Sequence, residues 1–329
     1  MGTGRWDSGT WSGYASSTYG TADRASLRSK STASIFTSSS MDPTLDPSKV
    51  KDSVTGTREA RDNDDNPLST PIIIGSDVTG SMGHMAQEVL TGMETVCTEL
   101  YDRKPVTDPQ ILTAAIGDML FDRAPLQVSQ FEADIRIVDS TRKLFIEGGG
   151  GGNFGESYAA LWLFAAMQTS TDAWEKRGEK GFLFTIGDEP LLGSKGLVGK
   201  GRAFYGDDAV AITPDQAKRF MGLDIQSPMS AEDCYDMASQ RWEIFHICVN
   251  KKYEQGVMDS FGSVLGERLL WMQDTAHLPE LIVSAIQVVK GASVADVAAS
   301  WSGDTSVAIA KSLGGLPAVA DAGGGVAAL

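Results

Sequence analysis

The stretch from residue 71 to residue 83 constrains the fold of this chain more than any other. It reads Pro-Ile-Ile-Ile-Gly-Ser-Asp-Val-Thr-Gly-Ser-Met-Gly, so a short apolar run passes into a polar loop. We predict a buried strand at 71–76 and a helix at about 83–102, because apolar residues recur in the second segment at spacings of three and four. A strand that passes through a short loop into a helix is a building unit of α/β sheets.

The loop between this strand and this helix carries the first candidate site. Asp77, Thr79 and Ser81 offer one carboxylate and two hydroxyls on alternate residues, so all three side chains can face one point. Oxygen ligands suit a hard cation, which predicts a divalent metal site at the carboxyl end of the strand. The same residue types also cap helices, where they satisfy free backbone amides, and this remains the alternative.

The alternation of strand and helix continues along the chain. Further strands are predicted at 111–116, 181–186, 242–249 and 268–272, with an edge strand or hairpin partner at 125–131. Helices are predicted at 132–146, 157–170, 213–222, 230–241, 253–265 and 278–289, and a loop at 171–180. The main strands are apolar throughout, which favours a mostly parallel sheet covered on both faces. The sequence therefore predicts a three-layer, Rossmann-like α/β domain flanked by helices.

The two ends of the chain differ in composition from the predicted domain at 67–291. Residues 1–66 are rich in Ser, Thr, Gly and Asp, which predicts a flexible, solvated arm. Four aromatic residues in this arm could dock on a partner or back on the domain: Trp6, Trp11, Tyr14 and Tyr19. Residues 292–329 form an Ala- and Gly-rich tail with one weak helix at about 293–312, and its last ten residues are expected to be flexible.

Charge and cysteine content exclude several classes of protein. The 43 acidic and 28 basic side chains give a net charge of −15, which is unsuited to binding a nucleic-acid backbone. Cys97, Cys234 and Cys248 are widely spaced and are expected to be buried thiols, as in a reducing compartment. No signal peptide or membrane span is evident, so we expect a cytoplasmic protein, or one incorporated in a particle assembled there.

Two later segments are expected to join the first loop. Parallel α/β sheets bind ligands outside the carboxyl ends of their strands. Asp188 directly follows the predicted strand at 181–186, and the five glycines at 148–152 end in Asn153 before a buried helix. The glycine run lacks the Gly-Lys-Ser/Thr ending of a nucleotide-binding loop. Glu189, beside Asp188, is expected to face solvent.

This order of motifs resembles the von Willebrand factor type A (vWA) domain family, over about residues 70–290. It is most similar to intracellular, bacterial or phage members. The resemblance implies a metal-ion-dependent adhesion site (MIDAS), with Asp77, Thr79 and Ser81 in its first loop and Asp188 in its third. The second loop departs from the pattern, because Asn153 stands where most members have Thr; Glu156 or Ser157 could take that role. The implied cation is Mg²⁺, with Mn²⁺ or Ca²⁺ as alternatives.

The ligand types indicate what such a site would do. Two carboxylates, two hydroxyls and an amide leave a divalent cation able to accept one more anionic oxygen. We therefore expect a metal-dependent protein–protein interaction module, not an enzyme, that binds an acidic residue of a partner protein. The alternative is a structural or assembly protein of a virion or large complex that uses its terminal arms. A metal-dependent hydrolase is less favoured, because no general base is evident beside the site.

Overall fold

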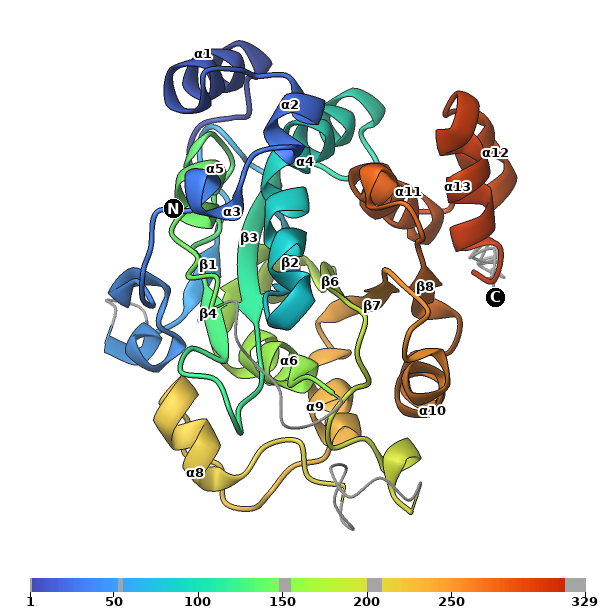
Figure 1. The fold of residues 1–329 in the computed structure, drawn as a ribbon. Helices are drawn as coiled ribbons and strands as arrows, with labels where there is room; N and C mark the ends of the chain where they lie inside the picture. The colour runs from blue at the N-terminus through green and yellow to red at the C-terminus, as the bar shows by residue number, and fades with distance from the viewer. Residues whose placement is uncertain (1, 53–55, 148–154, 200–208, 317–329) are drawn as a thin grey trace, which may run out of the picture.

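A computed structural model describes residues 2–52, 56–147, 155–199 and 209–316, without the side chains of Asp52 and Ser81. A six-stranded sheet lies at its centre, in the order β4-β3-β2-β6-β7-β8 (Figure 1). All neighbouring strands run parallel except β4, which is antiparallel to β3 at one edge. The strands are β2 (Thr70–Asp77), β3 (Pro109–Ile116), β4 (Leu126–Val128), β6 (Gly181–Gly187), β7 (Trp242–Cys248) and β8 (Leu269–Trp271). The predicted mostly parallel sheet is confirmed.

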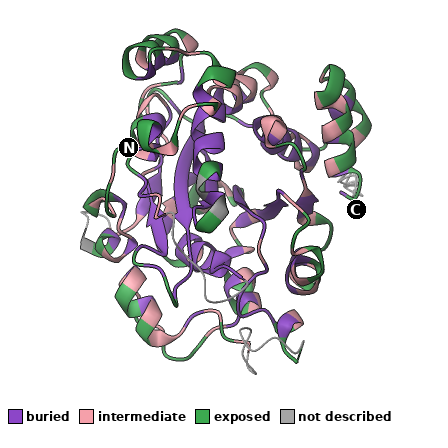
Figure 2. Ribbon diagram, in the orientation of Figure 1, coloured by how far each residue is buried: buried purple, intermediate pink, exposed green. Residues whose placement is uncertain are grey.

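Helices cover both faces of this sheet. Ile72 and Ile74 pack into one core with α4 (Gly83–Arg103) and α11 (Leu278–Val289), whereas Ile73 points into the opposite core. Successive residues of a strand face opposite sides, so β2 serves both cores. The second core contains α6 (Tyr158–Met167), α9 (Ala231–Ala238) and α10 (Glu254–Leu265). Figure 2 shows the buried strands between helices whose outer surfaces are exposed. The three-layer α/β architecture is therefore confirmed.

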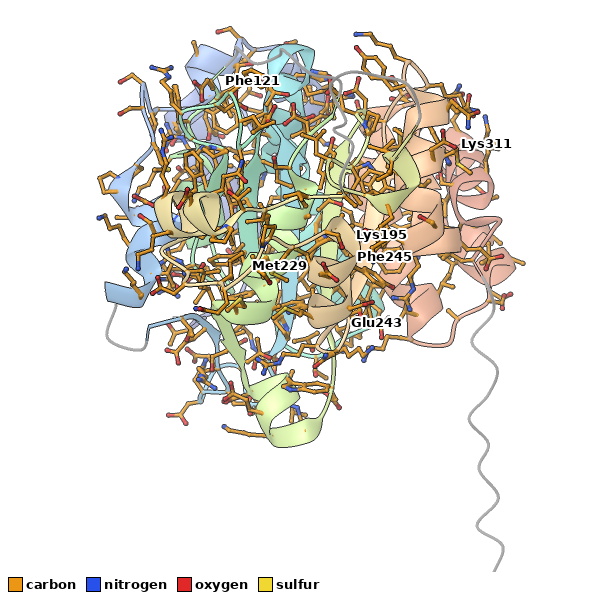
Figure 3. The ribbon with its side chains drawn as sticks, turned by 90° about the horizontal axis from the view of Figure 1, so that it is seen from below. Phe121, Lys195, Met229, Glu243, Phe245 and Lys311 are labelled. Atoms are coloured by element: carbon orange, nitrogen blue, oxygen red, sulfur yellow. The ribbon has the colours of Figure 1, made fainter. Side chains whose placement is uncertain are left out.

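Helix α6 approaches the sheet closely because β2 has a glycine at the contact. A side chain at Gly75 would collide with the Leu161 methyl group and would lie 3.0 Å from Ile116 Cδ1. Eight of the ten residues of α6 are buried, as its nearly continuous apolar sequence predicts. All three cysteines are buried and free, as expected. Figure 3, seen from below, shows Phe245 within the sheet and Phe121 and Lys311 toward the periphery.

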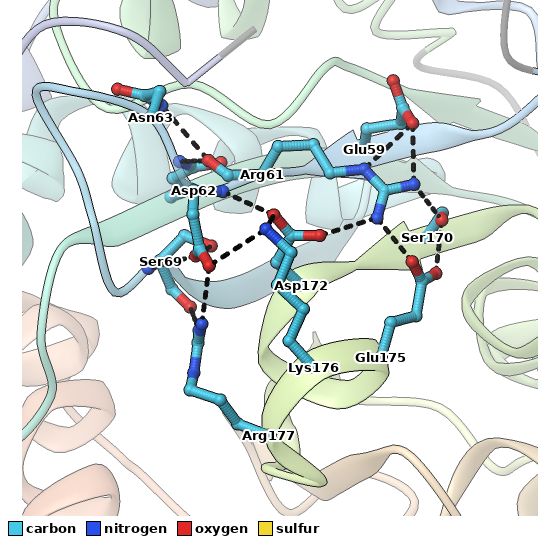
Figure 4. A network of polar contacts seen from close by, with 11 residues as sticks. Glu59, Arg61, Asp62, Asn63, Ser69, Ser170, Asp172, Glu175, Lys176 and Arg177 are labelled. Carbon is cyan, nitrogen blue, oxygen red and sulfur yellow. Dashed lines mark hydrogen bonds and ion pairs between the residues drawn. The ribbon is translucent and has the colours of Figure 1, made fainter.

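A second, two-stranded sheet was not predicted. β1 (Arg58–Ala60) pairs in parallel with β5 (Thr169–Thr171), which continues into α7 (Asp172–Arg177), within the segment expected to be a loop. A network of ion pairs holds these elements together (Figure 4). Arg61 contacts Glu59, Asp172 and Glu175, while Arg177 contacts Asp62 at 2.8 Å. Such long-range contacts leave no apolar periodicity in the sequence.

The N-terminal segment differs from the expected flexible arm. It forms α1 (Ser8–Tyr19), α2 (Arg24–Arg28), α3 (Thr32–Ile35) and the 3₁₀ turns η1 (Pro43–Leu45) and η2 (Pro47–Asp52). Trp11, Leu27 and Ile35 are buried in the same core as α4. Tyr14 donates a hydrogen bond of 2.7 Å to Asp139, and Arg28 pairs with Glu88 at 2.7 Å. The aromatic residues of this segment were expected to dock either on a partner or back on the domain, and in the structure they dock back on the domain.

The segment after α11 also packs on the domain. The weak helix expected at 293–312 is two helices, α12 (Val294–Ala299) and α13 (Gly303–Leu313). Trp301 lies in the connection between α12 and α13. The guanidinium of Arg103 in α4 is 3.6 Å from the centroid of its ring, and the indole N–H donates a hydrogen bond of 2.8 Å to the hydroxyl of Ser284 in α11. The expected flexible last ten residues lie outside the described ranges. None of the helices in those ranges combines the length and apolar character needed to cross a bilayer.

The remaining elements are short. α5 (Arg136–Thr141) covers only the middle of the helix expected at 132–146, because Glu132 forms an isolated bridge with Ile111. The helix expected at 213–222 is α8 (Pro214–Gln216) continued by a π-helical turn, Ala217–Met221. The other 3₁₀ turns are η3 (Gly80–Met82), η4 (Lys195–Leu197), η6 (Gly266–Arg268) and η7 (Thr275–His277).

Candidate functional site

The sheet topology places the first predicted loop at a switch point. From β2 the chain continues to β3 on one side, whereas β6 lies on the other side of β2. The loops that leave β2 and β6 therefore diverge at the carboxyl edge of the sheet, which is where the ligand-binding crevice lies in sheets of this kind. Asp77 is the last residue of β2, and Asp188 is the first residue after β6.

Asp77 is held by the loop that follows it and by α6. Its carboxylate is fully buried, and Oδ1 accepts hydrogen bonds from the backbone N–H and the hydroxyl of Thr79, each at 2.8 Å. Tyr158 donates to Oδ2 at 3.3 Å. This arrangement requires Gly187, because a Cβ there would lie 2.8 Å from Tyr158 Cζ and closer still to its hydroxyl oxygen. Asp77 is thus fixed at the base of the crevice.

Glu156 brings a second buried carboxylate to Thr79. Its backbone N–H donates to the Pro190 carbonyl at 3.0 Å, and its carbonyl accepts from Leu192 N at 3.1 Å, so the loop after β6 holds it in place. Glu156 Oε1 lies 2.7 Å from Thr79 Oγ1, which also lies 2.8 Å from Asp77 Oδ1. A hydroxyl has one proton and can donate to only one of two ionised carboxylates. A proton or a cation is therefore needed between these oxygens.

Asp188 faces the same crevice with one oxygen unsatisfied. Asn250, just beyond β7, donates to Asp188 Oδ2. Asp188 Oδ1 and Glu156 Oε2 are both buried and have no hydrogen-bond partner among the described residues. Leaving a charged acceptor buried and unsatisfied costs free energy, of the order of 1–3 kcal/mol or more for each group. These two oxygens are therefore free to accept a ligand.

The crowding of negative charge changes the protonation of the site. Burial, together with the charges of Asp188 and Glu189, raises the pKa of Asp77 to about 8. Burial and the charge of Asp77 hold the pKa of Glu156 well above its usual range. Burial and Asp188 raise the pKa of Glu189 to about 7, against the opposing charge of Lys252. The sequence led us to expect that Glu189 faces solvent. In the structure it is instead half-buried beside the site.

The structure brings together some of the predicted ligands. Asp77, Thr79 and Asp188 are buried at the carboxyl ends of the neighbouring strands β2 and β6. Ser81 lies in η3, directly after the loop, but its side chain is outside the described part of the structure, as is all of Asn153. Of the two alternatives named for the second loop, Glu156 reaches the site. Ser157 instead accepts a hydrogen bond from Met119 N at 3.0 Å.

Several residues near the site were not singled out from the sequence. Asp118 follows β3 and is buried, and its charge contributes to the raised pKa values of Glu156 and Glu189. The signal was present, because Asp118 stands after a buried strand as Asp77 and Asp188 do. Tyr158 and Asn250 gave no such signal, since their contacts with the carboxylates depend on helix and strand packing.

The donor set is suited to a hard cation, although its present arrangement is not a finished coordination shell. Among the described residues, no group of three or more His, Cys, Asp or Glu side chains is arranged to hold a metal ion. Asp77 and Glu156 both contact the hydroxyl of Thr79, the charge of Asp188 acts on Asp77, and one oxygen each of Glu156 and Asp188 lacks a partner among the described residues. Such ligands match the preferences of Mg²⁺ and Ca²⁺.

The fold and this crevice define the chain as a three-layer α/β domain with an acidic site at the switch point of its sheet. No family model matches the chain, and the comparison with curated proteins gives no match. Among solved structures, it is similar to the pilus adhesin SpaC of Lactobacillus rhamnosus GG, with 10% identity, a TM-score of 0.43 and coverage of 70% of this chain. The matched part is 31% of the adhesin, so this chain corresponds to about a third of that protein.

The chain is also similar to two further solved structures. A von Willebrand factor type A protein from Catenulispora acidiphila is 14% identical, with a TM-score of 0.35 over 69% of this chain and 44% of the other. The adhesive tip pilin GBS104 of Group B Streptococcus agalactiae is 8% identical, with a TM-score of 0.34 over 67% of this chain and all of that structure. These likenesses are too distant to say what this chain binds.

Proposed function

We propose that this chain is a metal-dependent protein-interaction module that binds a divalent cation, Mg²⁺ in the first instance, at Asp77, Thr79 and Asp188. Through that cation it would bind a carboxylate of a partner protein. The observation that carries the proposal is a pair of buried oxygens, Asp188 Oδ1 and Glu156 Oε2, which lie at the switch point of the sheet and have no hydrogen-bond partner among the residues that the structure describes. Ser81 and Asn153 remain predicted ligands.

Electrostatics supports a cation at this position. Asp77, Glu156 and Asp188 are buried side by side, and none of them forms an ion pair with a Lys or Arg in the described ranges. Uncompensated charge in a low-dielectric environment is costly, and a divalent cation would relieve it. When bound, the cation would supply a Lewis-acid position able to accept one further oxygen.

Glu156 changes the charge balance that the sequence suggested. With three carboxylates, an Mg²⁺ ion is held more strongly but attracts an incoming carboxylate less. The raised pKa of Glu156 favours its neutral form, since burial and the adjacent Asp77 both oppose its ionisation. A bound cation would favour the ionised form of Asp77, so with Glu156 protonated and Asp77 and Asp188 ionised the ligands would carry two negative charges, and the cation would keep its attraction for a partner carboxylate.

The first experiment tests the metal. Isothermal titration with Mg²⁺ and with Mn²⁺ compares the wild type with Asp188→Asn, which keeps the size of the side chain and removes its charge. Asp236→Asn, on the exposed side of α9, is the matched control. We expect Asp188→Asn to bind at least about tenfold more weakly, since a lost charged ligand costs more than about 1.4 kcal/mol. Equal binding by all three proteins would refute the metal site.

The second experiment tests the partner carboxylate separately. Mn²⁺ bound to the protein relaxes the protons of coordinated water, and a carboxylate that replaces this water lowers the effect. Titration with acetate is compared with titration of the neutral analogue acetamide. A decrease with acetate only supports recognition of a carboxylate. Metal binding without any acetate effect would leave the cation site in place and reject the interaction mechanism.

The assembly alternative relied on free terminal arms. The described N-terminal residues pack on α4, so they offer no support for an arm that becomes ordered only on contact.

A further inference from the structure

Arg58 is a buried cation without a counter-ion. It begins β1 and is only 6% exposed. One terminal nitrogen, Nη2, donates to the backbone carbonyls of Thr44 at 2.6 Å and Val128 at 3.2 Å. Among the described residues, the buried Nε–H has no hydrogen-bond partner, and no carboxylate forms an ion pair with Arg58. Burial lowers the pKa of this guanidinium to about 10.

Such an arrangement is costly unless an anion completes it. A buried charge without a partner is strongly destabilising, and a guanidinium that donates only to neutral carbonyls keeps most of its charge uncompensated. The nearby carboxylates are engaged elsewhere: Glu59 and Asp172 pair with Arg61 at 2.8 and 2.9 Å. These ion pairs are part of the network in Figure 4, which fixes β1 against β5. Arg58 is therefore held rigidly in position.

A pocket of about 480 Å³ adjoins this guanidinium. Two exposed lysines, Lys49 and Lys143, line it together with the hydroxyl-bearing residues Thr44 and Ser140. Neither lysine forms an ion pair in the described part of the chain, and no Asp or Glu is among the lining residues. In a chain of net charge −15, three cations around one pocket stand out as a local positive site.

One acidic residue, Asp42, lies next to the pocket, but it forms no ion pair with the lysines that line the pocket, Lys49 and Lys143, in the described part of the chain. Asp42 accepts hydrogen bonds from the backbone N–H and the hydroxyl of Thr44, at 2.8 and 2.7 Å. These bonds, with a smaller contribution from Lys143, lower the pKa of Asp42 and direct its carboxylate toward Thr44. The cations that face the pocket thus remain available to a ligand.

We propose that this pocket binds a small molecule through a phosphate monoester group, with Arg58 as the buried anchor and Lys49 and Lys143 at the rim. Three cations and the hydroxyl of Ser140 match a phosphate dianion better than a carboxylate, which carries one charge and fewer acceptor sites. The pocket volume lies within the range of about 300–1,000 Å³ usual for small-ligand sites and leaves room for an organic group. Pro43 and Leu45 provide apolar surface for that group.

Phosphate binding is tested by calorimetry at constant ionic strength, with inorganic phosphate and phenyl phosphate as probes and acetate and chloride as controls. We expect phenyl phosphate to bind more tightly than inorganic phosphate, and neither acetate nor chloride to bind. Inorganic phosphate that binds as tightly as the ester would reject the monoester. Equal responses to phosphate and chloride would reduce the effect to general ionic screening and overturn the proposal.

Substitutions of the three cationic residues test whether this pocket is the site that binds phenyl phosphate. The double variant Lys49→Gln/Lys143→Gln changes only exposed side chains and is expected to fold as the wild type does, yet to bind phenyl phosphate about tenfold more weakly. Arg58→Gln is expected to abolish binding. Lys311→Gln, on α13 at the far side of the molecule, is the matched lysine control and is expected to leave affinity unchanged (Figure 1). Unchanged affinity in the double variant would reject the pocket as the binding site.

Discussion

Replacing Gly187 with alanine tests whether the close approach of Tyr158 builds the site. The added Cβ would lie 2.8 Å from Tyr158 Cζ and 3.0 Å from Cε1, and the hydroxyl oxygen would be nearer still. Tyr158 has no room to retreat, because it is fully buried, with the rings of His246 and Phe261 at 4.8 and 5.5 Å between centroids. Overpacking of this kind costs about 1–3 kcal/mol, and we expect the upper end of that range.

A second substitution separates this collision from other effects of alanine. Tyr158→Phe removes the hydroxyl oxygen, which is the nearest atom, at the cost of the 3.3 Å hydrogen bond to Asp77, about 1 kcal/mol. In the Tyr158→Phe background, Gly187→Ala should cost only about half as much, since Cζ and Cε1 still lie close. The two substitutions should therefore show a coupling of about 1–2 kcal/mol in a double-mutant cycle.

Urea denaturation, followed by far-UV circular dichroism in the presence of a chelator, measures all four proteins. The slopes against urea must agree, so that differences in midpoint report differences in the free energy of unfolding. Additive effects within about 0.5 kcal/mol would show that the Gly187 and Tyr158 positions do not interact, and would refute the proposed reason for the glycine. Gly187→Ala with wild-type stability would refute the close approach itself.

Three further predictions concern the metal, a buried histidine and the N-terminal segment. Mg²⁺ at one hundred times its dissociation constant should raise the free energy of unfolding by about 2.7 kcal/mol, and Asp188→Asn should reduce this gain to about 1.4 kcal/mol or less at the same concentration. His246 is buried, which lowers its pKa from 6.5 to about 3. The unfolded chain therefore binds the proton on this histidine first as the pH falls, so His246 alone lowers the free energy of unfolding by about 2 kcal/mol between about pH 7.5 and pH 5. The raised pKa values of Asp77 and Glu189 act in the opposite direction, so the prediction is measured as the difference between the wild type and His246→Asn over this range. Trp11→Ala should cost about 3–5 kcal/mol, because this side chain is only 1% exposed.

Each of these predictions has a result that would contradict it. Equal midpoints with Mg²⁺ and with chelator would speak against a bound cation. If the free energy of unfolding changes with pH by the same amount in the wild type and in His246→Asn, the pH dependence arises from groups other than His246. A free energy of unfolding for Trp11→Ala within about 0.5 kcal/mol of the wild-type value would indicate that the N-terminal helices add little to the stability of the domain.

The sequence by itself determined the central sheet and the position of its acidic edge. Ile72, Ile73 and Ile74 are apolar on consecutive residues, and a strand buried on both faces needs that pattern wherever its neighbours lie. The bounds of β2, α4 and α11 follow closely from such local patterns. Because parallel strands end at one edge, the approach of Asp77 to Asp188 could also be predicted before the strand order was known.

Only the tertiary structure decided what surrounds those carboxylates. Glu156 contacts Thr79 across 77 residues of sequence, and Arg58 reaches Val128 across 70. The Ser- and Thr-rich N-terminal segment, whose composition predicts an arm, is ordered because Trp11, Leu27 and Ile35 find apolar surface on α4. Local propensity carries no information about such contacts: their free energy comes from burial and charge pairing, which exist only after distant segments have met.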